Sequence, residues 1–211
     1  MPSTADRELL TLHAVRLLGF ADSGRLAARY RLDPSETEET LLDHEARGWV
    51  TRSRFPGEPG WSLTELGRTA GEQLLAAQLD ARDARRTVSD AHARFLPLNR
   101  RFQDAATRWQ VRPLPGDPLA ANDHTDLRWD DRVVESLGAV GRGLAPLDAE
   151  LAAALPRLGG YGARYDAALT HVVRGESRWV DGLGIDSCHV VWMQLHEDLL
   201  ATLGLQRGDE H

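Results

Sequence analysis

The sequence predicts a mainly α-helical protein in which three helices and a short β-hairpin are followed by an all-helical C-terminal domain. Apolar residues recur at helical spacing through most of the 211 residues. Strand-like alternation is confined to 49–54 and 61–63. We therefore expect one domain at residues 1–80 and a second at 81–211, and the length of the second is ordinary for a single domain.

The three N-terminal helices are predicted from an apolar face and from capping residues. Leucines and a valine within 6–20 recur on one broad face of the first helix. Side chains suited to capping precede the next two helices, with Asp22 and Ser23 before the second and Asp33, Pro34 and Glu36 at the start of the third. We expect the third helix to run to Arg47 and to stop at Gly48.

A hairpin and a further helix are predicted next. The run 49–54 alternates like a strand, and 61–63 can return as a second strand. Between them, the prolines and glycines of 55–60 are typical of a turn. Thr64 suits the N-cap of a helix that begins at Glu65.

The C-terminal half is predicted to be a series of helices separated by proline and glycine. A long helix is expected over 70–94, with a break or kink at Pro97 and a second helix over 99–109. The prolines and the glycine within 111–122 indicate a loop. Further helices are expected, in order, over 128–137, 146–155, 161–173 and 185–203.

Composition and motifs argue against several classes of protein, namely disulfide-bonded, membrane-spanning and common enzyme classes. Cys188 is the only cysteine, so we expect a small core residue and neither an intrachain disulfide nor a multi-cysteine zinc site. No stretch is long and apolar enough to span a bilayer, and the polar N-terminus differs from a signal peptide, so we expect a cytoplasmic protein without a membrane partner. Nucleotide-binding glycine loops and the common hydrolase motifs are absent, so we expect no catalytic residues, no metal and no cofactor.

Two stretches resemble the winged helix-turn-helix regulators of the MarR and PadR type. Residues 46–50 are similar to the end of a recognition helix as it enters the wing, and residues 61–68 are similar to the return strand of the wing and the start of the next helix. The resemblance covers about residues 6–80. It implies double-stranded DNA as a partner, with the third helix in the major groove and the wing on the phosphate backbone.

The charges on the expected DNA-binding surface are uneven. The third helix would present Ser35, Glu38 and Glu39, and this acidic face repels phosphate, although a carboxylate can accept from cytosine N4. The second helix and the wing offer cations that can contact phosphate, which are Arg25, Arg29, Arg52 and Arg54. We expect these arginines to carry more of the affinity than the third helix.

Two polar residues of the third helix, Thr37 and His44, occupy positions where the family usually has aliphatic core residues. We expect a backbone carbonyl to hold the His44 ring. The alternative is an element that responds to pH or to a ligand.

One group of candidate effector-binding residues surrounds a predicted helix start. It consists of Asn122, His124 and Trp129. Acidic residues there also suit an ordinary helix N-terminus, with Thr125 or Asp126 as the cap. The segments 109–110, 122–126 and 195–204 resemble the C-terminal region of uncharacterised actinobacterial regulators, a resemblance that implies no particular ligand.

A second group of candidates lies on the last predicted helix. His189, Trp192 and His196 share one helical face, where they either line a pocket or bond to neighbours inside a core. The two histidines are about 10 Å apart along the axis, too far to chelate one zinc ion together. Arg101 and Trp109 are candidates for holding an anionic group, or Arg101 is a surface residue whose stem covers apolar neighbours.

These observations predict a homodimeric transcriptional regulator whose C-terminal helical domain binds a small-molecule effector. The acidic third helix supports an alternative, a protein-interaction module that keeps the winged-helix shape and no longer binds DNA. A less favoured alternative is a metal-dependent enzyme that uses His124, His189 and His196 with nearby carboxylates.

Overall fold

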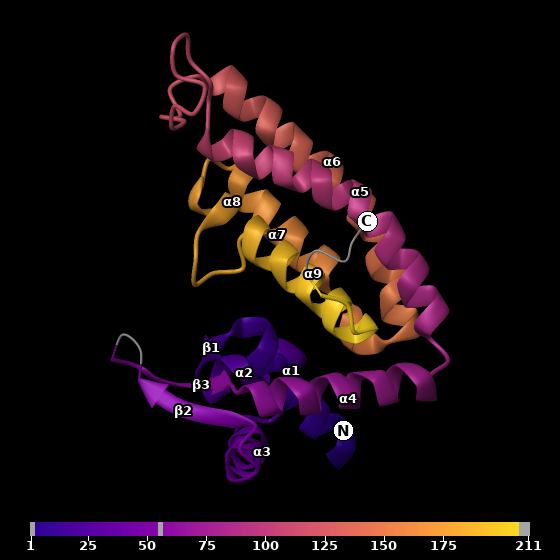
Figure 1. Cartoon of the computed structure of the whole chain (residues 1–211). Coiled ribbons are helices and arrows are strands. Elements are labelled where there is room, and N and C mark those ends of the chain that lie inside the picture. Colours follow the sequence, from indigo (N-terminus) through magenta and orange to yellow (C-terminus); the bar gives the residue numbers. More distant parts are fainter. Residues whose placement is uncertain (1–2, 55–56, 207–211) are drawn as a thin grey trace. The chain divides into compact units, whose positions relative to one another are not determined.

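The computed structural model describes residues 3–54 and 57–206. The chain divides into two compact units, of which one comprises Met1–Asp83 and Glu197–His211 and the other Ala84–His196. The chain is mainly helical, and its β-strands lie in the N-terminal part (Figure 1). The long helix α9 (Cys188–Leu203) belongs to both units, because its residues from Glu197 onward group with the first.

The first unit contains the predicted helices and hairpin. Its helices are α1 (Thr4–Leu18), α2 (Ser23–Tyr30), α3 (Pro34–Ala46) and α4 (Glu65–Ala81). Its strands are β1 (Phe20–Ala21), β2 (Val50–Arg54) and β3 (Pro59–Leu63), which form an antiparallel sheet in the order β1-β3-β2. Strand β1 was not predicted, because two residues are too few to show alternation. Residues 55 and 56 of the predicted turn lie outside the described residues.

The predicted capping residues begin their helices. The Asp22 carboxylate accepts from the Arg25 amide at 2.9 Å. The Asp33 carboxylate accepts from the amides of Ser35 and Glu36 at 2.9 and 3.0 Å. The Thr64 hydroxyl accepts from the first turn of α4. Since each cap satisfies amides that a helix start leaves without partners, these side chains fix where the helices begin.

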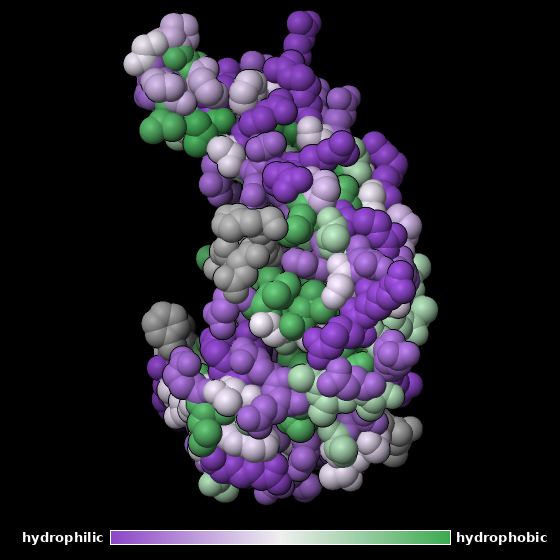
Figure 2. Space-filling model, turned by 45° about the vertical axis from the view of Figure 1, so that its right-hand side comes forward, coloured by the Kyte–Doolittle hydropathy of each residue, from purple (hydrophilic) through white to green (hydrophobic). Residues whose placement is uncertain are grey.

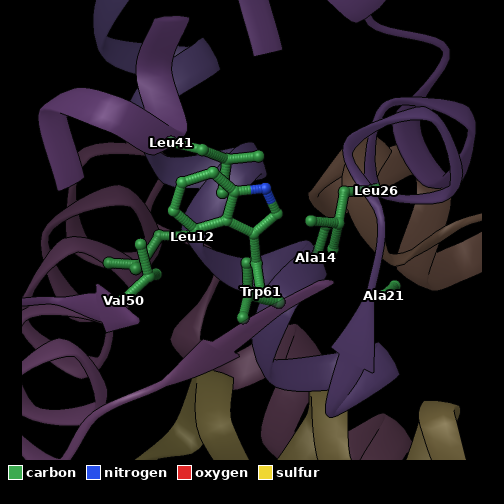
Figure 3. Packing of buried hydrophobic residues seen from close by; sticks show 8 residues of the cluster. Leu12, Ala14, Ala21, Leu26, Leu41, Val50 and Trp61 are labelled. Carbon is green, nitrogen blue, oxygen red and sulfur yellow. The ribbon is translucent and has the colours of Figure 1, made fainter. Parts of the chain in front are cut away.

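The core of the first unit is built around Trp61 of β3. Its indole is almost fully buried and lies among aliphatic side chains from the helices and from β2 (Figure 3). The buried residues of this cluster are Leu12, Ala14, Val15, Ala21, Leu26, Leu41, Val50 and Trp61. The three helices and the sheet therefore share one core, and this arrangement is consistent with a winged-helix-like region.

The second unit consists of helices. They are α5 (Arg85–Gln110), α6 (Leu127–Ala154), a 3₁₀ turn (Pro156–Leu158), α7 (Tyr161–Val173), α8 (Arg178–Asp181) and the first residues of α9. Helices α5 and α6 lie side by side (Figure 1). Helix α7 has the predicted bounds. The single-turn helix α8 was not predicted, and α9 begins at Cys188 rather than at the expected residue 185.

Two predicted interruptions were wrong. The break expected at Pro97 lies instead at 82–84, where Asp83 adopts a left-handed conformation with φ of 49°, and α5 continues through Pro97. Likewise α6 is continuous and includes Pro146, whereas the sequence predicts two helices, over 128–137 and 146–155, separated by glycines. Both prolines are exposed. Water can therefore solvate the carbonyl that each proline leaves without a helical donor. This lowers the free-energy cost of continuing the helix through the proline.

The glycines inside α6 allow close packing. A Cβ on Gly143 would lie 2.7 Å from Leu98 Cδ2, and a Cβ on Gly141 would lie 3.1 Å from Tyr165 Cε1. These glycines therefore permit α5 and α7 to approach α6 closely, although glycine itself is a poor helix former.

Exposed apolar side chains are dispersed. The face seen in Figure 2 is largely hydrophilic and carries small hydrophobic patches. Among the residues that the structure describes, the exposed large apolar ones are Leu42, Leu66, Leu114, Leu119, Leu127, Val173 and Leu183. Exposed residues of this kind are normal on globular proteins when they are scattered.

Two glycines of α4 make a matched pair of tests. A Cβ on Gly67 would lie 1.9 Å from the carbonyl oxygen of Trp49, whereas a Cβ on Gly71 would make an ordinary 3.6 Å contact with Leu12. We expect Gly67→Ala to destabilise the protein by about 3 kcal/mol, because the backbone must shift. Gly71→Ala should stabilise it by roughly 0.5–1 kcal/mol through helix propensity. Denaturant unfolding of both variants measures this, and equal effects would contradict it.

Candidate functional site

Helices α2 and α3 form a corner that presents α3 to solvent. Arg31, between the two helices, has a left-handed backbone with φ of 55°, which turns the chain sharply. On α3 the side chains of Ser35, Glu39 and Asp43 are exposed, and Glu38 is half-buried. The predicted outward face of α3 is therefore acidic in the structure as well.

Glutamate side chains form ion pairs with two arginines near this face. Arg52 of the wing strand β2 lies 3.8 Å from the Glu38 carboxylate, and its guanidinium stands 5.4 Å from the centre of the Trp61 ring. Arg7 pairs with Glu36 at 2.6 Å. Arg52 and Glu38, both predicted to contact DNA, thus contact each other.

Other predicted DNA-contacting arginines have different surroundings. Arg25 and Arg54 are exposed and form no ion pair within the part of the chain that the structure describes. Arg29 is half-buried, and its guanidinium lies 4.6 Å from the Tyr30 ring centre. Arg25 and Arg54 are therefore the two members of the predicted set best placed to contact a phosphate.

His44 is held as predicted by a backbone carbonyl. Its ring is fully buried, its Nε2 lies 3.1 Å from the Glu8 carbonyl oxygen, and it packs on Trp49 with ring centres 5.1 Å apart. The Nδ1 atom has no hydrogen-bond partner among the described residues. Burial lowers the pKa of His44 below its usual value of 6.5, so the neutral form is favoured. Thr37 is also buried, and its hydroxyl donates to the Asp33 carbonyl.

The lowered pKa of His44 predicts acid sensitivity. The unfolded state takes up a proton near pH 6.5 while the folded state resists it, so stability present above pH 6.5 is lost as the pH falls toward the folded pKa. We expect His44→Leu to lose less unfolding free energy between pH 7.5 and 5.5 than the natural protein. Urea unfolding at both pH values tests this, and equal losses in the two proteins would contradict the assignment.

A buried histidine–aspartate contact that was not predicted joins α1 to α9 in the first unit. His13 Nε2 lies 2.8 Å from Asp198 Oδ1, and the two residues are 2% and 0% exposed. Because a carboxylate only accepts hydrogen bonds, Nε2 donates the proton in this contact. The sequence offered a partial indication, since both residues interrupt otherwise apolar helical faces, but it does not show that they pair.

A second set of contacts joins the same helices. Arg16 on α1 contacts Glu197 through Nε and Glu72 of α4 through Nη1, each at 2.9 Å. Its side chain is only 8% exposed. The guanidinium thus ties α1, α4 and the end of α9 together.

We expect removal of one partner from the buried pair to weaken the first unit strongly. Asp198→Ala leaves a buried imidazole without its acceptor, and a loss of about 3–5 kcal/mol is typical for such a change. The double variant His13→Leu, Asp198→Leu removes both polar groups and should recover much of the loss. Amide hydrogen exchange in α1 measures the local stability. If the single and double variants lose the same stability, the pair has no such role.

The first group of predicted effector residues is brought together at one end of α5 and α6. The Asn122 amide donates to the Trp109 carbonyl at 3.0 Å and to Asp130 at 2.8 Å. His124 Nδ1 lies 3.0 Å from Asp130, and the His124 ring is 4.4 Å from that of Trp109. Trp129 donates to the backbone of Arg108 at 2.7 Å. The predicted N-cap, Asp126, accepts from the Trp129 amide.

These contacts explain why the residues cluster, since they anchor a loop. They hold 111–126 against the start of α6 and satisfy the buried amide of Asn122. The His124 side chain is 41% exposed, so part of it is accessible to solvent. Arg101, by contrast, is exposed on α5.

The second group lies in an aromatic core of the second unit. Trp192 is fully buried between Phe95 and Phe102, with ring centres 4.9 Å away on each side. Its indole N–H donates to Asn99 at 2.8 Å. His196 packs on Phe95, and the half-buried His189 packs edge-on to Phe102.

Cys188 lies in the same core, as predicted. It is fully buried, and burial raises the pKa of its thiol to about 12. Burial likewise raises the pKa of Tyr165 above its usual range, and its hydroxyl lies 3.2 Å from the Leu137 carbonyl. The thiolate needed for reactivity is therefore disfavoured at neutral pH.

Among residues 3–54 and 57–206, no cluster of three or more histidine, cysteine, aspartate or glutamate side chains has the geometry to hold a metal ion. None of the helices described is long and apolar enough to cross a membrane. Searches against family models, curated proteins and solved structures found no match to the chain.

Proposed function

We propose that the chain is a DNA-binding transcriptional regulator of the winged helix-turn-helix type. One observation carries the proposal: the order helix, strand, two helices and hairpin, closed as a β1-β3-β2 sheet with α3 exposed. In this architecture the third helix enters the major groove and the hairpin contacts the backbone. A MarR- or PadR-like role, assembly as a homodimer and response to a small-molecule effector held by the helical unit are parts of the same proposal.

The charges favour different roles on DNA for the exposed arginines, which would supply affinity, and for α3, which would select sequence. Phosphate contacts supply most of the sequence-independent affinity. The exposed cations available for this are Arg25 at the start of α2 and Arg54 at the end of β2, since Arg52 already contacts Glu38. The acidic face of α3 then opposes non-specific binding. Glu38 and Glu39 can still accept from cytosine N4, so the third helix would select sequence rather than add affinity.

The acidic face also supports a second candidate function, a protein-interaction module that does not bind DNA. The α3 surface combines Glu39 and Asp43 with Leu42, whose side chain is 47% exposed. A basic segment with one apolar side chain would complement this surface.

Two charge variants test the DNA-binding proposal. We expect Arg54→Gln to weaken binding to any duplex and to reduce the salt slope by about 1, because one phosphate contact is lost. Glu38→Gln should strengthen binding to the unrelated duplex several-fold, because it releases Arg52 and removes a repelling charge, and should reduce the preference for the upstream region. Fluorescence anisotropy at several salt concentrations, with the upstream region of the gene and an unrelated duplex, provides the measurement.

The control is Arg174→Gln, which changes an exposed arginine of the second unit. It should leave DNA affinity unchanged. If the natural protein binds neither duplex at low salt, the DNA-binding proposal fails and the protein-interaction function is favoured.

A further inference from the structure

The first unit contains a small open pocket that none of the roles above uses. Its volume is about 220 Å³, equal to that of roughly seven water molecules in the liquid. The pocket is formed by α1, α4, α9 and the residues that follow α9. Its lining residues are Arg16, Arg68, Glu197, Leu200, Leu205 and Gln206. All of them belong to the first unit.

The lining carries one net positive charge, from two arginines and one glutamate. Arg16 is largely buried, and its Nε and Nη1 are engaged by Glu197 and Glu72. Its orientation is therefore fixed, while no described residue accepts from Nη2, whose donors can serve another acceptor. Arg68 is exposed and has no ion-pair partner among the described residues. A fixed guanidinium and one without an ion-pair partner in the described part of the chain thus border the same pocket.

We propose that this pocket binds a small organic carboxylate. The carboxylate lies between Arg68 and the remaining donors of Arg16, because planar guanidinium groups match its two oxygens. The hydrocarbon part of the ligand is short and faces the half-buried Leu205, since Leu200 is almost fully buried. A monoanion fits better than a phosphate, since Glu197 in the lining opposes a second negative charge.

Binding at this pocket has a direct consequence for the first unit. Arg16 already connects α1, α4 and the end of α9, so a ligand that contacts it adds a further link among the same three elements. We therefore expect an occupied pocket to stabilise the unit by mass action. The site does not depend on the proposed DNA-binding function, and its test uses no DNA.

The experiment is an NMR titration of the ¹⁵N-labelled full chain at constant ionic strength. The probes are butyrate, its neutral analogue butanamide, and inorganic phosphate. We expect butyrate alone to give saturable shifts of the Arg68 side-chain Nε–H and of the Gln206 amide. Arg68→Gln should weaken butyrate binding about tenfold, the loss of one charge-assisted interaction.

The matched control is Arg82→Gln, which changes an exposed arginine next to the other end of α4. It should bind butyrate as the natural protein does. Both variants change exposed side chains, so we expect both to keep the fold. Their NMR spectra check this. Absence of saturable shifts, equal shifts with butanamide, or equal affinity in Arg68→Gln and the natural protein would overturn the proposal. Phosphate binding in place of butyrate would overturn the assignment of a carboxylate.

Discussion

A histidine–aspartate pair with almost no exposed surface joins the first helix of the chain to its last. Moving two ionisable groups out of water is costly, and the cost is offset only when they meet in good geometry. The 2.8 Å contact between His13 and Asp198 meets that condition. Beside it, Arg16 forms ion pairs with both α4 and α9. The first unit is therefore complete only when the end of α9 is in place, and the pocket inferred above exists for the same reason.

Local chemistry in the sequence was sufficient to predict where most elements of the first unit begin. Asp22, Asp33 and Thr64 cap their helices as expected, because a cap depends on residues only two or three positions away. The interruptions expected in the second unit failed because they depend on tertiary packing. Proline favours a helix break at Pro97, yet its exposed position tolerates the lost hydrogen bond. The glycines of α6 are contact surfaces for neighbouring helices.

The candidate sites could likewise be predicted only where their residues are close together in the sequence. The sequence grouped Asn122, His124 and Trp129, and the structure adds Trp109 to them through the carbonyl that Asn122 contacts. These residues flank one loop, so their proximity follows from the chain. The pairing of His13 with Asp198 could not be inferred, since the two lie 185 residues apart and each alone is an ordinary polar residue on an apolar face. Nor does a sequence show that Arg52 of β2 lies next to Glu38 of α3.

The connection between α1 and α9 also constrains how the protein is made. Ribosomes add roughly 5–20 residues per second, so Asp198 follows His13 by roughly 10 to 40 seconds. During that interval the N-terminal helices and the hairpin can collapse around Trp61 while His13 and Arg16 still lack their α9 partners. Until α9 has been made, the winged-helix-like region therefore lacks these contacts. The contacts of α9 with His13 and Arg16 therefore form only after the helices and the hairpin of the first eighty residues have been made.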